Sequence, residues 1–405
     1  MLYISIIILL LALIYHYDYQ GHKKGRKEIY ITCAVIFILV AGLRYRLGTD
    51  TIAYENKYPF FPDLFEYFSF DFSQTRYGPG FILFAAIPKT ISNEFVLLQL
   101  FHAAFVTSVV FYFFYTNTHH PFFAVLLYGL ISYFPFTFEV LRESCAVCML
   151  LIGWKFFLKS KWIKYYVCAI IAILFHPSGA VMLILPLGYI QPIRSIFKIG
   201  KYFWISLGLV YIIVMFLSIK FFDLIRLIEI ADVDNYANSY ENSKYATGSS
   251  MNIVGIVSWC TRVILYPLLA IIIIKRQHRI KTSDTINDEK LSKLEYMTCW
   301  FVYIAIMTLY IKLFYRFNNY FYPFAIVAIS DAVFSKIKIS NSTYRLRFTF
   351  WIAVLTPFFL TNFYGLFNND SGSGIPYIRR YYPYSSVINP HKDKQRENLF
   401  SFHGR

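Results

Sequence analysis

The sequence predicts an all-α membrane protein with many spans, and three observations lead to this prediction. Hydrophobic residues make up 57% of the 405 residues and charged residues only 15%, which is more apolar surface than one soluble core can bury. Apolar runs of about 17–25 residues recur along the chain, and this is the length that an α-helix needs to cross a bilayer. Short basic loops separate the runs, whereas a β-barrel would show alternating runs of about 10 residues.

Basic residues in the loops predict the side of the membrane that each loop faces. The positive-inside rule places the segment after the first span in the cytoplasm because it contains Lys23, Lys24, Arg26 and Lys27. Further cytoplasmic loops are expected at residues 155–164, 194–201, 275–293 and 336–347. The segment 81–91 is too short to cross and contains Pro88, so we expect a re-entrant or interfacial helix there. About 12 transmembrane helices remain, with both chain ends outside.

The expected domain organisation is one polytopic transmembrane domain over residues 1–365, with external loops at 45–80 and 220–250, and an external tail at 366–405. Residues 375–390 of the tail combine paired arginines with tyrosines and prolines, which predicts an ordered lid or strap. The formal charge of +16 is explained by loops that orient the protein, so no nucleic-acid partner is expected. The six cysteines fall in apolar runs, where cysteine acts as a small hydrophobe. We expect no metal and no cofactor.

Residues 42–58, GLRYRLGTDTIAYENKY, are where the sequence most strongly suggests chemistry. Arg44 and Arg46 follow the apolar run of the second span, and Gly48 allows the chain to leave the helix. Asp50 supplies a carboxylate that can accept a proton or orient an arginine. Arg44 taken alone has a simpler explanation, because arginines at the ends of spans commonly extend to the lipid headgroups.

Other spans bring basic residues to the same predicted external side. Arg142 opens an apolar helix, and His176 stands at the break between two short spans. On a helix, Arg316 shares its face with Asn319 and Tyr320. Each has a structural alternative: a headgroup contact for Arg142, a hydrogen-bonded helix end for His176, and helix–helix contacts for the stripe of Arg316.

The external arginines as a set predict a site for an oxyanion. They are Arg44, Arg46, Arg76, Arg142, Arg316, Arg379 and Arg380. A planar guanidinium binds phosphate oxygens in pairs, whereas lysine suffices to orient a loop. Arginines on the external side are exceptions to the positive-inside rule, and such an exception needs a functional or structural cause. Because the chain has no P-loop and no Rossmann glycine fingerprint, we expect a lipid-linked diphosphate whose departure the arginines stabilise.

Several motifs together resemble the EpsG family, the Wzy-type polymerases of bacterial exopolysaccharide, capsule and O-antigen. They are LRYRLGTDTIAY, YGPGF, LRESCAV, LFHPSG, YRFNNYF and PYSSVINP, which extend in this order from about Arg44 to Pro390. The resemblance implies a membrane glycosyltransferase of GT-C-like architecture. Such an enzyme transfers a growing chain from undecaprenyl diphosphate to a hydroxyl of a new repeat unit, by single displacement with inversion.

The resemblance implies roles for Arg44, Arg46, Asp50, Arg142, His176 and Arg316, and further residues are expected to join them. The diphosphate is expected to bind Arg44, Arg46, Arg76, Arg142 and Arg316. Asp50 or His176 is expected to take the proton of the acceptor hydroxyl, with Asp50 the first choice and Arg142 the third catalytic residue. The sugar or acceptor is expected to contact Tyr54, Asn319 and Tyr320.

Alternative functions stay open at this point. A flippase or transporter for lipid-linked oligosaccharides would show charged residues near the middle of spans and paired discontinuous helices. An O-antigen ligase-type transferase would share the site and differ in its acceptor, and a membrane acyltransferase would need a histidine–acid pair on the cytoplasmic side. Expected partners are undecaprenyl-diphosphate-linked oligosaccharide, the lipid bilayer, a chain-length regulator and a flippase. The expected location is the cytoplasmic (inner) membrane, multi-pass, with the active site facing the periplasm or exterior.

Overall fold

The computed structural model describes residues 2–75, 77–191, 193–217, 257, 259–281, 285–311, 314–335, 367 and 374–403. The regular elements in these ranges are helices, and no β-strand occurs among them, which confirms the all-α prediction for this part of the chain. The chain divides into two compact units, one formed by Met1–Leu183 with Trp351–Arg405 and the other by Ile184–Phe350. The expected external loop at 220–250 lies outside the described residues, and the division into a domain at 1–365 and a tail stays a prediction.

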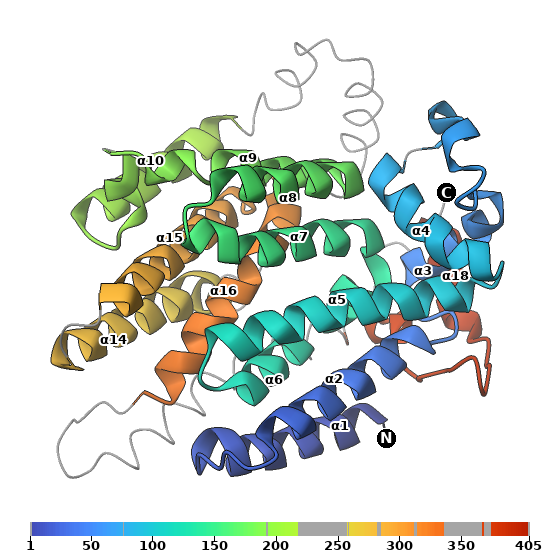
Figure 1. Ribbon diagram of the computed structural model, residues 1–405, viewed down its shortest axis with the longest axis horizontal. Coiled ribbons are helices and arrows are strands. Elements are labelled where there is room, and N and C mark those ends of the chain that lie inside the picture. The colour runs from blue at the N-terminus through green and yellow to red at the C-terminus, as the bar shows by residue number, and fades with distance from the viewer. Residues whose placement is uncertain are drawn as a thin grey trace. The chain divides into compact units, whose positions relative to one another are not determined.

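The first unit is a bundle of helices with short helices gathered at one of its ends. Its helices are α1 (Leu2–Leu13), α2 (Arg26–Gly42), α3 (Thr49–Lys57), α4 (Pro79–Ile91), α5 (Phe95–Asn117), α6 (Pro121–Ile131), α7 (Leu141–Leu158), α8 (Trp162–Phe175) and α18 (Lys394–His403). Helix α5 packs against both α2 and α7, and α7 packs along α8 (Figure 1). The short helices α3, α4 and α18 gather at one end of this bundle (Figure 1).

Contacts within the first unit show which segments lie at the same end of the bundle. At one end, Arg26 Nη2 donates to the carbonyl oxygen of His119 at 2.5 Å, which joins the loop before α2 to the loop after α5. At the other end, Gly42 at the end of α2 lies against Leu100 near the start of α5. The long helices α2 and α5 therefore run antiparallel, and the segment that follows α2 lies at the end opposite Arg26.

Helix α4, the segment expected to be re-entrant or interfacial, begins and ends beside the same short helix. Tyr77, just before α4, stacks on Tyr54 of α3 with ring centres 5.6 Å apart. Lys89, near the end of α4, donates to the carbonyl oxygens of Tyr58 and Pro59 at 2.9 and 2.7 Å. Since α3 has only nine residues, α4 does not run the length of the bundle.

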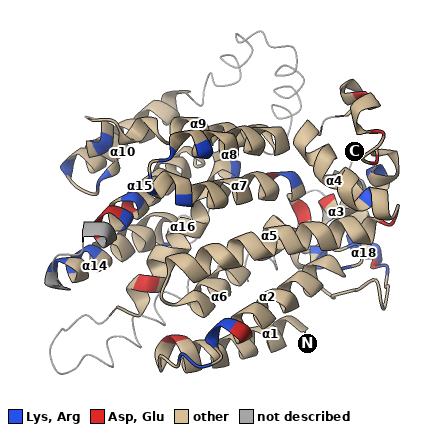
Figure 2. Cartoon of the chain, viewed as in Figure 1, with Lys and Arg blue, Asp and Glu red and all other residues tan. Residues whose placement is uncertain are grey.

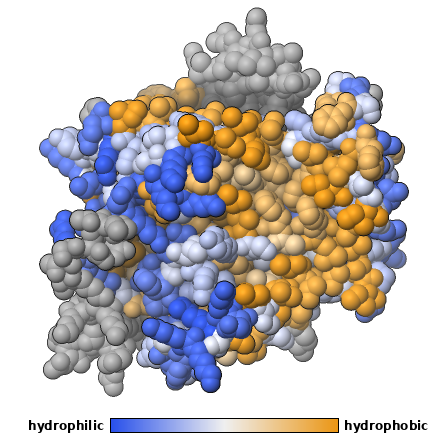
Figure 3. All heavy atoms as spheres, viewed as in Figure 1, coloured by the Kyte–Doolittle hydropathy of each residue, from blue (hydrophilic) through white to orange (hydrophobic). Residues whose placement is uncertain are grey.

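Apolar surface covers much of the first unit. Two described helices are long and apolar enough to cross a bilayer by themselves, Leu2–Tyr19 and Phe95–Asn117. Helices α1 and α8 expose large apolar side chains, among them Ile4, Ile8, Ile163 and Ile170. Figure 3 shows broad apolar areas on the face in view, and Figure 2 shows long stretches of α5 and α7 without charged residues. The expected total of about 12 spans stays a prediction.

The second unit is formed by α10 (Lys201–Leu217), α14 (Tyr266–Lys281), α15 (Thr285–Met307) and α16 (Tyr315–Val333). Helices α14, α15 and α16 pack on one another, and α10 packs on α15. Two segments that the charge pattern assigns to the same side meet here, because Arg194 Nη2 donates to Ser292 Oγ of α15 at 3.0 Å.

Candidate functional site

Arg142 is held in a fixed orientation at the start of α7. Its Nε donates to the hydroxyl of Tyr54 at 3.3 Å, and its guanidinium carbon lies 4.8 Å from the centre of the Tyr77 ring. We call Arg142, Tyr54 and Tyr77 the Arg142 cradle. Both tyrosines are buried, whereas Arg142 is only partly buried. The cradle therefore fixes the orientation of the guanidinium and leaves it partly accessible.

Helix α3 adds an acid and a second cation beside the cradle. Asp50 and Tyr54 are four residues apart, so they share one face of α3, and Asp50 is exposed. Lys57 Nζ lies 5.5 Å from the centre of the Tyr77 ring. Burial raises the pKa of the Tyr54 hydroxyl to about 12, so this group stays protonated at neutral pH. The arrangement combines a carboxylate with two cations next to a neutral hydroxyl.

Two glycine motifs of the sequence are in contact at the same place. A Cβ on Gly78 would overlap the carbonyl oxygen of Leu174, and a Cβ on Gly80 would lie 2.9 Å from Leu174 Cβ. The YGPGF segment therefore packs directly on the end of α8 in LFHPSG. His176, two residues beyond Leu174, is buried, and its Nδ1 lies 2.6 Å from Ser178 Oγ and accepts from Ser178 N at 3.2 Å. This geometry favours the helix-end alternative for His176.

Arg44 is completely buried. Its Nη1 donates to the carbonyl oxygen of Ala41, and its Nη2 lies 3.3 Å from Thr51 Oγ1 and 3.4 Å from the carbonyl oxygen of Phe138. Phe138 also lies beneath the guanidinium, with its ring centre 4.9 Å from the guanidinium carbon. Arg44 thus ties the end of α2 to α3 and to the turn before α7. In this position it supports the cradle and does not face a ligand.

Arg46 is engaged by two carboxylates. Its Nε and Nη2 each donate to Glu397 at 2.7 Å, and its Nη1 donates to Glu55 at 2.6 Å. The hydrogen bonds from Arg46 lower the pKa of Glu397, whereas burial raises the pKa of Glu55. Arg46 therefore attaches the tail helix α18 to α3, and its charge is already matched by acids.

The tail crosses the same end of the bundle as an ordered strap, and its Arg380 pairs with an acid that the sequence reasoning missed, Glu139. Arg44 and Ser386 form an antiparallel bridge, and Gly48, with φ 86°, donates its N–H to the carbonyl oxygen of Arg380 at 2.9 Å. Arg380 Nη1 pairs at 3.5 Å with Glu139, which is buried in the turn before α7. The sequence contains a signal for this acid, because a carboxylate within an apolar segment such as FPFTFEV usually has a charged partner or a function.

The other residues predicted for the site lie in the second unit, in the tail or outside the described residues. Arg316, Asn319 and Tyr320 lie on α16 in the second unit, where Tyr320 is completely buried. Their meeting with the arginines of the first unit stays a prediction. Arg76 lies outside the described residues. Arg379 is 3.9 Å from Asp393 of the tail. In the described part of the chain, no three histidine, cysteine or carboxylate side chains are grouped as a metal site needs.

The fold and the site define a helical membrane protein that presents an oriented arginine beside a carboxylate at one end of a helix bundle. A family model described as EpsG family matches residues 27–386, nearly the whole chain, and the protein belongs to this family. No curated protein and no solved structure matches the sequence. Membership assigns the protein to exopolysaccharide biosynthesis, with a polymerase role of the glycosyltransferase kind.

Proposed function

We propose that the protein is an inverting polysaccharide polymerase that joins undecaprenyl-diphosphate-linked repeat units at the external face of the cytoplasmic membrane. The observation that carries the proposal is the Arg142 cradle, in which a partly accessible guanidinium is held by a hydrogen bond and an aromatic face. Preorganised cations of this kind stabilise a departing diphosphate without reorganising during the reaction. The first turn of α7 adds the positive end of a helix dipole.

The reaction is a single displacement. The oxygen of the acceptor hydroxyl attacks the anomeric carbon of the donor sugar while the bond from that carbon to the diphosphate oxygen breaks. The bonding electrons leave with the diphosphate, whose added charge Arg142 and Lys57 stabilise. Asp50, exposed beside the cradle, takes the proton of the acceptor hydroxyl as the new bond develops.

This proposal changes the roles of several residues that the sequence grouped together. Arg44 and Arg46 become positioning residues, because one is buried and the other is paired with two carboxylates. Tyr54 orients Arg142 and does not primarily contact a sugar. His176 holds the end of α8 against the segment that carries Tyr77.

The flippase and the ligase are the alternatives. A flippase would place its anion-binding charges near the middle of spans, whereas Arg142 is the second residue of its helix. A ligase-type transferase would use the same departing diphosphate and differ only in its acceptor.

Deletion of the gene, followed by analysis of the surface glycan and of the lipid-linked pool, separates these functions. Loss of a polymerase leaves single repeat units attached to lipid and to the surface acceptor, and this is the expected result. Loss of a flippase leaves no repeat unit outside, and loss of a ligase leaves long chains attached to undecaprenyl diphosphate. Either of these two outcomes would overturn the proposal.

A further inference from the structure

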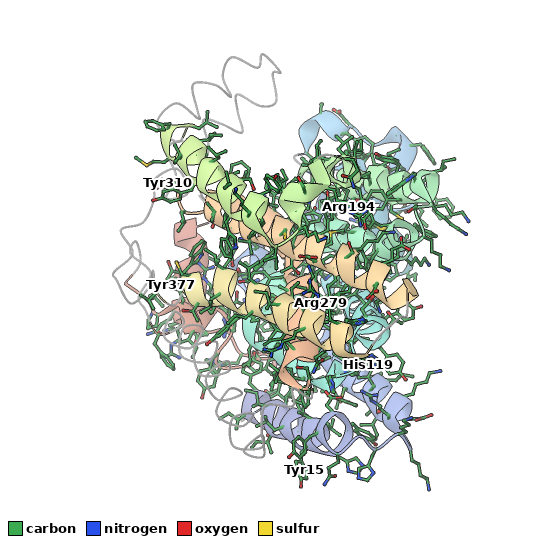
Figure 4. The ribbon with its side chains drawn as sticks, turned by 90° about the vertical axis from the view of Figure 1, so that its left-hand side faces the viewer. Tyr15, His119, Arg194, Arg279, Tyr310 and Tyr377 are labelled. Carbon is green, nitrogen blue, oxygen red and sulfur yellow. The ribbon has the colours of Figure 1, made fainter. Side chains whose placement is uncertain are left out.

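The second unit contains a hollow basic region, and the inference drawn from it is independent of the proposed function. Two adjoining cavities of about 430 and 420 Å³ share Lys198, Ser292 and Glu295 in their walls. The walls come from the segment before α10, from α14 and from the first half of α15. Figure 4 labels two of the residues concerned, Arg194 before α10 and Arg279 on α14.

Cations outnumber acids around these cavities. The charged lining residues are Arg194, Lys198, Lys275 and Arg279 against Asp288 and Glu295, with His278 beside them. Both acids already have partners. Glu295 accepts from Lys275 Nζ at 2.9 Å and from Ile199 N at 2.8 Å, and Asp288 lies 3.3 Å from His278.

The three other cations have no such match. Within the described ranges, no carboxylate lies at ion-pair distance from Arg194, Lys198 or Arg279. The cavity walls therefore carry surplus positive charge, which a bound anion would balance.

Arg194 is preorganised for that anion. Its guanidinium carbon lies 4.5 Å from the centre of the Tyr189 ring. Nη2 lies 3.0 Å from Ser292 Oγ and 3.4 Å from the Tyr189 hydroxyl. Stacking fixes the plane of the guanidinium, and a fixed planar fork binds tetrahedral oxyanions in pairs of hydrogen bonds. The hydroxyls of Ser292 and Tyr189 add donors of the kind that phosphate oxygens accept.

We propose that these cavities bind a phosphate-bearing ligand, either the headgroup of an anionic phospholipid or a soluble phosphate. A volume of about 430 Å³ suits a headgroup-sized molecule, whereas a folded segment of a protein partner would need a larger surface. The charge pattern assigns the segments 194–201 and 275–293 to the cytoplasmic side, where anionic lipids bind basic pockets between helices. The bound phosphate bridges the segment before α10 to α14 and α15.

The test measures binding to the purified full-length protein in a neutral detergent. The probes are inorganic phosphate, dihexanoyl phosphatidylglycerol and, as a zwitterionic control, dihexanoyl phosphatidylcholine. Arg279→Gln is compared with Arg276→Gln, because both arginines are exposed on α14 and only Arg279 lines a cavity. Lys198→Gln is compared in the same way with its control, Lys201→Gln. Arg194→Gln tests the third cation of the cavities. Loss of one charged hydrogen-bonding group weakens binding about tenfold.

We expect phosphatidylglycerol to bind, phosphatidylcholine to bind far more weakly, and Arg279→Gln, Arg194→Gln and Lys198→Gln to lose about tenfold while the two controls do not. Competition by phosphate only at high concentration identifies the ligand as lipid, and binding of phosphate as tight as that of the lipid identifies a soluble ligand. Either result supports the site. Failure of both anionic probes to bind, or equal losses in Arg279→Gln and Arg276→Gln, would overturn the proposal.

Discussion

Two arginines that look alike in the sequence have opposite surroundings. Arg44 is completely buried and hydrogen-bonded to three groups of the protein, whereas Arg142 is partly accessible and lies over an aromatic ring. Burial of a charge is tolerated only where its partners are fixed. The first therefore holds the structure together, and the second is accessible to the diphosphate that we propose as its ligand.

Replacement of Arg44 by methionine is expected to destabilise the protein and to lower its abundance in the membrane. The change removes a donor from the carbonyl oxygen of Ala41 and from Thr51 Oγ1, while the carbonyl oxygen of Phe138 keeps only its hydrogen bond from Thr51. A buried polar group that loses its partner costs about 1–3 kcal/mol. Quantitative blotting of membranes and thermal unfolding in detergent measure the effect. Arg142→Ala serves as the matched control and should accumulate normally. Equal abundance of the Arg44 variant and wild type would contradict the structural role.

The aromatic face beneath Arg142 gives a second test at this scale. Tyr77→Leu removes the ring and should lower kcat/KM for polymerisation by about 5- to 30-fold, since a partly desolvated cation–π contact contributes about 1–2 kcal/mol. Tyr77→Phe keeps the ring and should retain most of the activity. Initial rates with saturating and limiting donor separate the effects on kcat and KM. Similar losses in both variants would show that the hydroxyl, and not the ring, is what matters.

Sequence reasoning found part of this site and missed the rest for a physical reason. Asp50 and Tyr54 lie in the stretch at residues 42–58 that the sequence singles out, and Arg142 follows from its place at the start of an apolar helix. Tyr77 and Lys57 enter the site only because α4 folds back beside α3, and nothing in the local sequence encodes that contact.

At the scale of elements, the site depends on close packing between the start of α4 and the end of α8. Gly78 and Gly80 lie against the backbone and side chain of Leu174, where a Cβ does not fit. The apolar helices were predictable from apolar length, whereas the expected loop at 275–293 is largely helical, since α14 extends to Lys281 and α15 begins at Thr285. The π-helical turn Pro135–Glu139, which leads into α7, was not predictable, because such turns arise from packing and not from local composition.

Gly78→Ala is expected to displace the segment that carries Tyr77. Overpacking of this kind costs about 1–3 kcal/mol, so thermal stability should fall by several degrees and activity should fall further than stability alone explains. Gly129→Ala is the control in the same unit, because its Cβ would meet only Phe37 at 4.0 Å. A Gly78→Ala variant with wild-type stability and activity would show that α8 yields easily and that this contact does not set the site.

At the scale of the whole molecule, the chain returns to its own beginning. The tail pairs with the residues after α2 through the bridge of Arg44 with Ser386 and through the ion pair of Arg46 with Glu397. Tyr384 adds a hydrogen bond to the carbonyl oxygen of Val40 at 3.1 Å. Composition predicted an ordered strap. Its anchoring points join residues about 340 positions apart, and no local pattern specifies such pairs.

Glu397→Gln should loosen α18 from α3. Loss of a bidentate charged pair costs about 1.5–3 kcal/mol, so hydrogen exchange in α18 should accelerate about tenfold or more at neutral pH. Glu94→Gln, at an exposed acid of the same unit, is the control. The pKa of Glu397 is lowered in the folded protein, so its contribution is complete above the ordinary value of 4.5 and is lost as the pH falls through the lowered value. Unchanged exchange in Glu397→Gln would mean that the bridge alone anchors the tail.

The most direct measurement of the central claim is polymer formation by purified protein from isolated lipid-linked repeat units, with released undecaprenyl diphosphate measured in parallel. We predict that Arg142→Ala lowers kcat/KM by about 100-fold or more, that Arg142→Lys recovers only part of it, and that both proteins unfold at the wild-type temperature. Wild-type rates of polymer growth and diphosphate release from Arg142→Ala would contradict the claim that Arg142 stabilises the departing diphosphate.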